Sequence, residues 1–157
     1  MPNQAAILTV GEKYVSGQAK DESGDLLAGI LNKLGWEIAQ RAMVGDDDAQ
    51  ISGQIIQWVD TGTIDAVFTL DGVGIQPKDR ASEALYQVCE KWIPGIPEYV
   101  RAKLSEKTPG VILYRGLCGV RGKTLILNLP GTPIALKDTM DVLKTTIRLT
   151  VEQLKGV

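Results

Sequence analysis

Two glycine turns, each lying between an apolar run and a helix-like segment, are the part of this sequence best suited to chemistry. In the first, the apolar run 66–70 leads into residues 71–74 (Asp-Gly-Val-Gly), and Asp79 then precedes an amphipathic segment. The second occupies residues 127–133 (Leu-Asn-Leu-Pro-Gly-Thr-Pro). Glycine lets a backbone bend and approach a ligand closely, and a helix N-terminus offers free N–H groups to an anion. The two turns therefore predict a site for a ligand that bears phosphate.

Charged residues near the expected strand ends indicate how the charge of a phosphate ligand is neutralised. The acidic ones are Glu12, the run 46–48 and Asp79. Carboxylates beside a phosphate repel it, so we expect a bridging divalent cation, and a hard one such as Mg²⁺. The basic residues expected to neutralise phosphate oxygens are Lys78, Arg80, Arg115 and Lys123. This inventory is typical of phosphoryl or nucleotidyl transfer, in which catalysis depends on positioning and charge neutralisation.

Each of these features also has a purely structural interpretation. Asp79 is a natural helix N-cap, and the run 46–48 is equally well explained as an N-cap in a solvated acidic turn. The first glycine turn does not match the dinucleotide fingerprint, because Pro77 stands where the third glycine belongs. Spacing alone therefore supports only an α/β domain with a phosphate ligand.

Composition excludes several other classes of site. The chain of 157 residues has no histidine, which rules out Ser-His-Asp and Cys-His catalysis. Cys89 and Cys118, the only two cysteines, cannot form a usual structural zinc site and are expected as reduced thiols in or near the core. The net charge of −2 gives no nucleic-acid footprint, and the apolar runs are too short to span a membrane. The first residues lack a signal-peptide pattern, so we expect a cytoplasmic protein.

The segments that must position these residues alternate between strand-like and helix-like patterns. We predict a single domain, residues 1–157, with strands at 5–10, 36–44, 66–70, 110–114 and 123–129, the last two forming a hairpin or an irregular excursion. Helices are expected at about 20–34, from an N-cap at Asp46 or Asp47 to Val59, at about 81–89, from the break at 94–97 to about 105, and at about 133–154. Strands separated by amphipathic helices imply a three-layer α/β/α sandwich with a mostly parallel sheet. Ligands of such sheets bind outside the carboxyl ends of the strands, where both glycine turns fall.

Taken together, these segments resemble the MoaB/Mog family, the molybdopterin-binding domain of molybdenum cofactor biosynthesis. The family's Gly-Gly-Thr-Gly, the Asp that follows it and its Thr-Pro-Glu/Asp-Ala are matched in order by residues 71–74, Asp79 and residues 81–84. The late Leu-Asn-Leu-Pro-Gly-x-Pro is intact at residues 127–133. Further matches are 21–24 for an early Asp-x-Ser-Gly, Asp46 after the second strand, 94–98 for Pro-Gly-Phe-x-Glu and Tyr114-Arg115 for a Ser-Arg pair. The resemblance covers essentially the whole chain.

The resemblance implies an activity and a set of site residues. Active family members bind molybdopterin and Mg-ATP and transfer an adenylyl group to the terminal phosphate of the pterin. Asp79 and Asp46 then hold Mg²⁺ and position the nucleotide as the catalytic residues. The residues expected to bind substrate or nucleotide are Asp71, Gly72, Val73, Gly74, Lys78, Glu12, Ser23, Arg115, Asn128, Pro130 and Gly131. Partners are small molecules, with no nucleic acid and no membrane, and the family implies a homo-oligomer, a trimer or a hexamer.

Departures from the family pattern keep two other functions open. Asp71 replaces the first glycine of the loop, Val73 and Ala81 replace threonines, and Gly11-Glu12 replaces a Ser-Asp pair. Each lost hydrogen bond to a charged ligand is worth about 1.5–3 kcal/mol. The alternatives are a binding module of the same fold, which holds a pterin, a nucleotide or a protein partner without turnover, and an enzyme that hydrolyses another nucleotide, as in the related domain of the competence-damage proteins.

Overall fold

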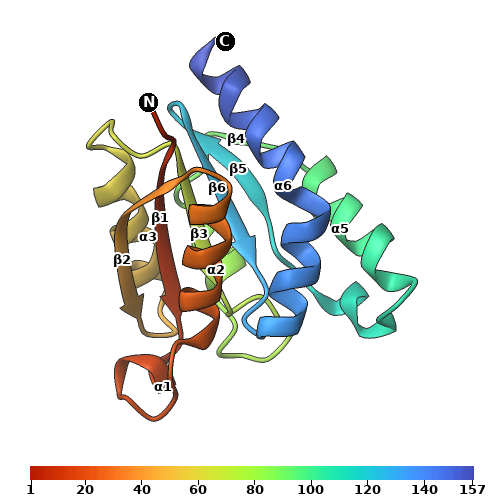
Figure 1. Ribbon diagram of the computed structural model, residues 1–157. Coiled ribbons are helices and arrows are strands. Elements are labelled where there is room, and N and C mark those ends of the chain that lie inside the picture. Colours follow the sequence, from red (N-terminus) through yellow and green to blue (C-terminus); the bar gives the residue numbers. More distant parts are fainter.

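The computed structural model describes all 157 residues and contains one six-stranded sheet with helices on both faces (Figure 1). The strands are β1 (Gln4–Val10), β2 (Glu37–Val44), β3 (Ala66–Leu70), β4 (Lys91–Trp92), β5 (Cys118–Arg121) and β6 (Thr124–Leu129). The helices are α1 (Glu12–Val15), α2 (Glu22–Lys33), α3 (Asp48–Val59), α4 (Ala81–Leu85), α5 (Gly95–Ser105), the 3₁₀ helix η1 (Pro109–Leu113) and α6 (Pro133–Lys155). This confirms the predicted mostly parallel α/β/α sandwich.

The sheet has the order β2-β1-β3-β6-β5-β4. Strands β2, β1, β3 and β6 are parallel neighbours, whereas β5 and β4 join the far edge through antiparallel pairs. Helical crossovers connect the parallel strands, and a tight turn at Gly122, with φ of 60°, closes the β5–β6 hairpin. The order reverses between β1 and β3, which is the point where open α/β sheets usually bind ligands.

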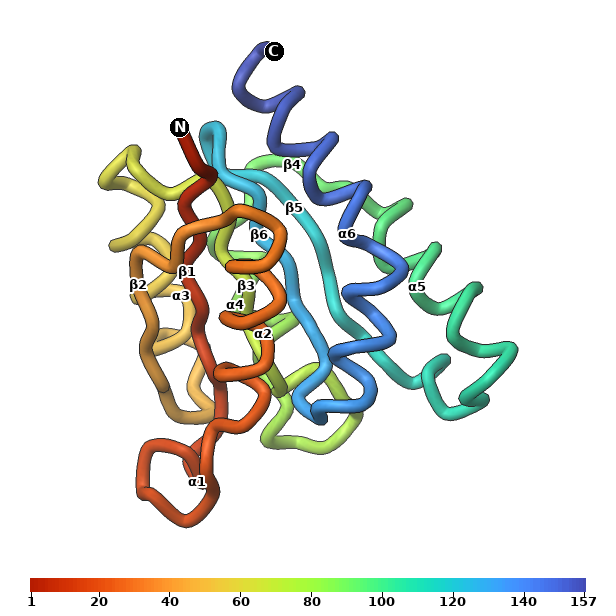
Figure 2. Tube along the Cα trace, in the orientation of Figure 1, coloured from red at the N-terminus to blue at the C-terminus, as the bar shows by residue number.

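Two hydrophobic cores cover the two faces of the sheet. One joins α2, α5 and α6 to the sheet, with Trp36 packed edge-on against Phe68 at 5.9 Å between ring centroids. The other joins α3 and α4 to the opposite face through Ile51, Ile55 and Leu85. Every residue of β3 and of β6 is buried, as expected for strands covered on both sides. The tube in Figure 2 shows the front layer of α2 and α6 crossing these central strands.

The prediction of a strand at 110–114 is wrong. Residues 110–113 belong to η1, which begins at Pro109 and is capped by Tyr114, and Ile112 is 67% exposed. The hairpin exists, but its first strand is β5, further along the chain. The predicted helix at 81–89 is also too long, because α4 ends at Leu85, and the short elements α1 and β4 were not predicted. The other predicted elements are confirmed to within a few residues.

The fold brings four loops to one edge of the sheet. Since β1, β2, β3 and β6 are parallel, the loops that follow them all emerge at their carboxyl ends, the lower edge in Figure 1. Both chain termini lie at the other end, where Lys155 bonds to Asn3 and Asp65. Cys89 and Cys118 are unpaired, and burial raises the pKa of Cys89 to about 12 and that of Cys118 further. No helix has the length and apolar character needed to cross a membrane.

Candidate functional site

Two adjoining cavities lie at the carboxyl edge of the sheet, and both glycine turns contribute to them. The apolar cavity, of about 410 Å³, lies between the β3–α4 loop, α5, η1 and the start of α6. The polar cavity, of about 330 Å³, lies between α1, the start of α2 and the β6–α6 turn. Gly131 and Thr132 line both cavities. The β6–α6 turn therefore borders both cavities.

The walls of the apolar cavity are mainly aliphatic side chains. Its walls include Leu104 of α5, Val111 and Leu113 of η1 and Ala135 of α6. Ligand sites are typically apolar clefts with a few polar groups that fix orientation. The predicted site residues that line this cavity are Val73, Gly74, Asp79, Pro130 and Gly131. Its α5–η1 wall was not predicted, because apolar residues on a helix give no signal that distinguishes a cavity from the core.

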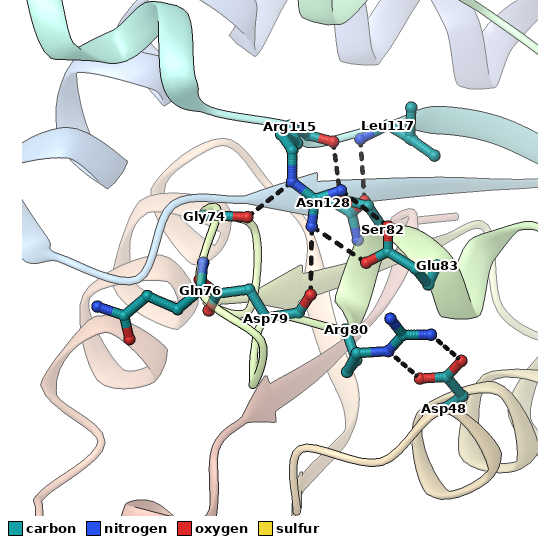
Figure 3. Close-up of polar contacts among 10 residues, drawn as sticks. All are labelled: Asp48, Gly74, Gln76, Asp79, Arg80, Ser82, Glu83, Arg115, Leu117 and Asn128. Atoms are coloured by element: carbon teal, nitrogen blue, oxygen red, sulfur yellow. Dashed lines mark hydrogen bonds and ion pairs between the residues drawn. The ribbon is translucent and has the colours of Figure 1, made fainter.

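Arg115 holds the β3–α4 loop in shape from outside this cavity (Figure 3). Its guanidinium donates to the carbonyls of Gly74 at 2.7 Å and Asp79 at 3.2 Å. It also forms a bidentate ion pair with Glu83 and thereby lowers the pKa of that carboxyl. The backbone of Arg115 adds an N–H bond to Val73 O at 2.8 Å. In this structure the residue braces the loop, and its charge is already paired.

Asp79 projects into the loop that it helps to form. Its Oδ2 accepts a hydrogen bond from the N–H of Gln76 at 2.9 Å. The same oxygen lies so close to Gly74 that a side chain there would begin 2.7 Å from it. The interpretation of Asp79 as a helix cap is wrong, since α4 begins after Arg80 with no side-chain cap. Asp79 is thus a carboxylate of the cavity wall with one oxygen still available.

The acidic run after β2 divides into three different roles. Asp47 is the N-cap of α3 and accepts from the N–H of Gln50 at 3.0 Å. Asp48 pairs with Arg80 through two hydrogen bonds of 2.7 and 2.8 Å, which lower the pKa of Asp48. Asp46 accepts from the N–H of Glu12 at 3.2 Å. The structural interpretation of this run is therefore correct for Asp47, and Arg80 is already paired.

The structure does not gather the acidic residues into one metal-binding cluster. No group of three or more Asp, Glu, Cys or His side chains is arranged to hold a metal ion. Asp79 lines the apolar cavity, whereas Asp46 and Glu12 line neither cavity. Because Mg²⁺ is often held by one or two carboxylates together with substrate phosphates, Asp79 fits as a single protein ligand. The predicted pairing of Asp79 with Asp46 has no support in this geometry.

The polar cavity contains an unexpected contact between Tyr14 and Asp71. Tyr14 Oη donates to Asp71 Oδ2 at 3.1 Å, and Lys13 Nζ lies 3.7 Å from the same oxygen. Burial, together with the charge and hydrogen bond of Asp71, raises the pKa of Tyr14 to about 12. Sequence analysis missed Lys13, Tyr14 and Lys20, which line this cavity. Their position directly after β1, beside the point where strand order reverses, was the available signal.

The remaining predicted residues have scaffold or peripheral positions. Ser23 lines the polar cavity, and its hydroxyl donates to Gly131 O at 2.7 Å, joining α2 to the β6–α6 turn. Asn128 donates to Thr69 Oγ1 at 2.6 Å and accepts from the N–H of Leu117 at 2.9 Å, and its side chain is fully buried and therefore out of reach of a ligand. Gly72 is buried behind the loop, and Lys78 is exposed on it. Lys123 lies at the opposite end of the sheet and is excluded from the site.

Fold and site together define an α/β ligand-binding domain whose cavities are built from two glycine turns at the switch point of the sheet. Residues 6–149 match the family model described as "Probable molybdopterin binding domain", and the chain belongs to this family.

Solved structures and curated proteins give the same result. The crystal structure of the molybdopterin biosynthesis enzyme MoaB from Thermus thermophilus superposes with a TM-score of 0.92 at 31% identity, covering 99% of this chain and 98% of that one. A molybdopterin adenylyltransferase of Helicobacter pylori (strain J99) is 29% identical over 96% of this chain and 86% of its own length. The molybdenum cofactor synthesis protein cinnamon of Drosophila melanogaster is 30% identical over 90% of this chain. The chain spans only 24% of the Drosophila protein and 49% of a second relative, and both of these proteins are much longer than this chain. These matches agree with the family model.

Proposed function

We propose that this chain transfers an adenylyl group from ATP to the terminal phosphate of molybdopterin. The observation that carries the proposal is the pair of cavities that border the β6–α6 turn, an apolar one that we assign to the pterin ring and a polar one lined by Lys13, Lys20 and Ser23. The Helicobacter pylori relative is a molybdopterin adenylyltransferase, and its match over 96% of this chain supports the same choice.

The reaction requires positioning more than it requires covalent help from the protein. An oxygen of the pterin phosphate attacks the α-phosphorus of ATP, a new P–O bond forms, and pyrophosphate leaves as the bond to the β-phosphate breaks. The loop braced by Arg115 and the β6–α6 turn orient the two reactants, and the cavity walls exclude water. Asp79, at the wall of the apolar cavity, would hold Mg²⁺ through its free oxygen, and the metal would neutralise the phosphates of the nucleotide there, whereas the polar cavity takes the terminal phosphate of the pterin.

Isothermal titration with ATP and Mg²⁺, with and without molybdopterin, followed by detection of adenylylated pterin, tests this function. Magnesium-dependent ATP binding and adenylylated product are expected for the unchanged protein. Asp79→Asn should abolish product formation while leaving the fold intact, and Asp60→Asn, at the opposite end of the sheet, is the matched control. Absence of product from a folded protein that binds molybdopterin would contradict the proposal.

A binding module without turnover is the second candidate, and one observation favours it. The carboxylate of Asp71 lies inside the polar cavity, where an enzyme of this kind needs to hold phosphate. Pterin binding without any ATP binding in the same titration would support the module.

We also propose that residues 1–157 fold as one domain and that copies assemble into a homo-oligomer. The resemblance to the family supports a trimer or a hexamer. Light scattering coupled to gel filtration measures the assembly directly, and a mass of 17.0 kDa would contradict it.

A further inference from the structure

The carboxylate of Asp71 takes up hydrogen-bond donors that a phosphate in the polar cavity needs. Oδ1 accepts from the N–H of Gly72 at 2.9 Å, and Oδ2 accepts from the hydroxyl of Tyr14 at 3.1 Å. The ammonium group of Lys13 lies 3.7 Å from Oδ2. A backbone N–H, a hydroxyl and an ammonium group are the donors from which anion sites are commonly built. A side chain of the protein thus already occupies this place.

Close packing holds the Asp71 carboxylate in position. Asp71 has a φ of 73°, the only residue other than glycine with a positive value, and Gly72 follows with 74°. Its side chain lies against Gly131, where a Cβ would be 2.5 Å from Asp71 Cγ. The carboxylate therefore fills the space between the two glycine turns, and 32% of the side chain remains exposed toward the polar cavity.

The charges that line the polar cavity balance because of Asp71. Lys13 and Lys20 contribute two positive charges, and Glu22 and Asp71 contribute two negative charges. Tyr14, with its pKa raised to about 12, stays a neutral donor. Replacing Asp71 by a neutral residue leaves the cavity with a net positive charge, and replacing it by glycine also frees the donors that its carboxylate occupies.

We propose that Asp71 determines ligand specificity by acting as a tethered anion that competes with phosphate for the donors of the polar cavity. The cavity of this chain then binds phosphate groups weakly, although Lys13, Lys20 and the hydroxyl of Tyr14 line it. This inference rests on the proposed function only in assigning the phosphate-bearing part of the ligand to the polar cavity.

Calorimetric titration with inorganic pyrophosphate, without Mg²⁺, tests the inference and needs neither nucleotide nor pterin. Asp71→Asn keeps the side-chain volume and the acceptor for Tyr14 but removes the charge. We expect it to bind pyrophosphate at least about tenfold more tightly than the unchanged protein, since one repulsive charge at a few ångströms is removed. Asp60→Asn, which removes an equal charge at the opposite end of the sheet, should have no effect.

Two additional variants locate the effect and guard against misfolding. Asp71→Gly suits a φ of 73° and should show the same gain even if Asp71→Asn folds poorly. Adding Lys13→Met to either variant should remove the gain, because the freed phosphate donor is lost. An unchanged affinity in both Asp71 variants, or a gain that survives Lys13→Met, overturns the proposal.

A titration with Mg²⁺ present separates this role from cation recruitment. If Asp71 holds a cation for the ligand, the Asp71 variants will lose magnesium-dependent binding instead of gaining affinity in its absence, and the inference is overturned. The proposed function fails by a different readout, the absence of adenylylated pterin, so the two outcomes remain distinguishable.

Discussion

Arg115 and Glu83 form an ion pair in which Nη1–Oε2 is 2.8 Å and Nη2–Oε1 is 3.1 Å. The pair connects α4 to the segment before β5, across 32 residues of sequence. The same guanidinium donates to the carbonyls of Gly74 and Asp79, so the shape of the β3–α4 loop depends on this pair (Figure 3). A bidentate ion pair fixes the orientation of the guanidinium as well as its distance, so it can hold a binding loop in one conformation.

Arg115→Met should loosen the loop and weaken ligand binding while keeping the fold. It removes the donors to two loop carbonyls and leaves Glu83 unpaired, a cost of about 1–3 kcal/mol in the free energy of unfolding. Urea denaturation measures this cost, and hydrogen exchange at Ile75 and Gln76 reports the loop itself. Arg148→Met breaks a pair with Glu152 on the surface of α6 and should cost at most about 0.5 kcal/mol. Equal losses in both variants would show that Arg115 is an ordinary surface arginine.

Stability should fall in acid partly through Glu83. Its pKa is lowered below the ordinary value of 4.5 by hydrogen bonds from Arg115. The pair therefore stabilises the fold fully at pH values above the unfolded pKa, and this stabilisation is lost as the pH falls through the folded pKa. Glu83→Gln should flatten the decline in unfolding free energy below pH 4.5, measured by urea denaturation at a series of pH values. Glu106→Gln, at an exposed glutamate with no ion pair, should leave the slope unchanged.

Gly131→Ala should destabilise the protein because of Asp71. A Cβ at Gly131 would lie 2.5 Å from Asp71 Cγ, so the carboxylate or the turn must move, at a cost of about 1–3 kcal/mol. In an Asp71→Gly background the obstruction is absent, and the same alanine should cost at least about 1 kcal/mol less. The double-mutant cycle, followed by thermal or urea unfolding, measures this coupling. Additive effects would mean that the two side chains do not meet.

Asn128→Ala should strongly destabilise the folded protein, and this effect should be measurable in the absence of ligand. The change leaves Thr69 Oγ1 and the N–H of Leu117 without their buried partner, at a cost of about 2–4 kcal/mol in unfolding free energy. Asn32→Ala, on an exposed position of α2, should have little effect. If Asn128→Ala lowers the unfolding free energy only slightly but abolishes ligand affinity, Asn128 is a ligand-binding residue after all.

Local patterns in the sequence predicted most of the helices and strands. The apolar spacing of α2, α3 and α6 and the continuous apolar run of β3 follow from which faces must be buried, and they need no distant information. The two glycine turns were placed correctly for the same reason, because turn residues act on their own backbone. The strand prediction for residues 110–114 was wrong because a short apolar run fits a strand or a helix equally well. The packing of η1 beside α5 decided between the two.

The partners of the site's side chains were decided only by the tertiary structure. Tyr14 and Asp71 are 57 residues apart and meet because β1 and β3 are neighbours whose carboxyl ends share one edge. The same parallel arrangement sends Lys123 to the opposite end of the sheet. Sequence alone identified the residue types and turns that suit a phosphate ligand. Which charges are free and which are already paired depends on distances of a few ångströms between segments remote in sequence, and only the packed fold sets those distances.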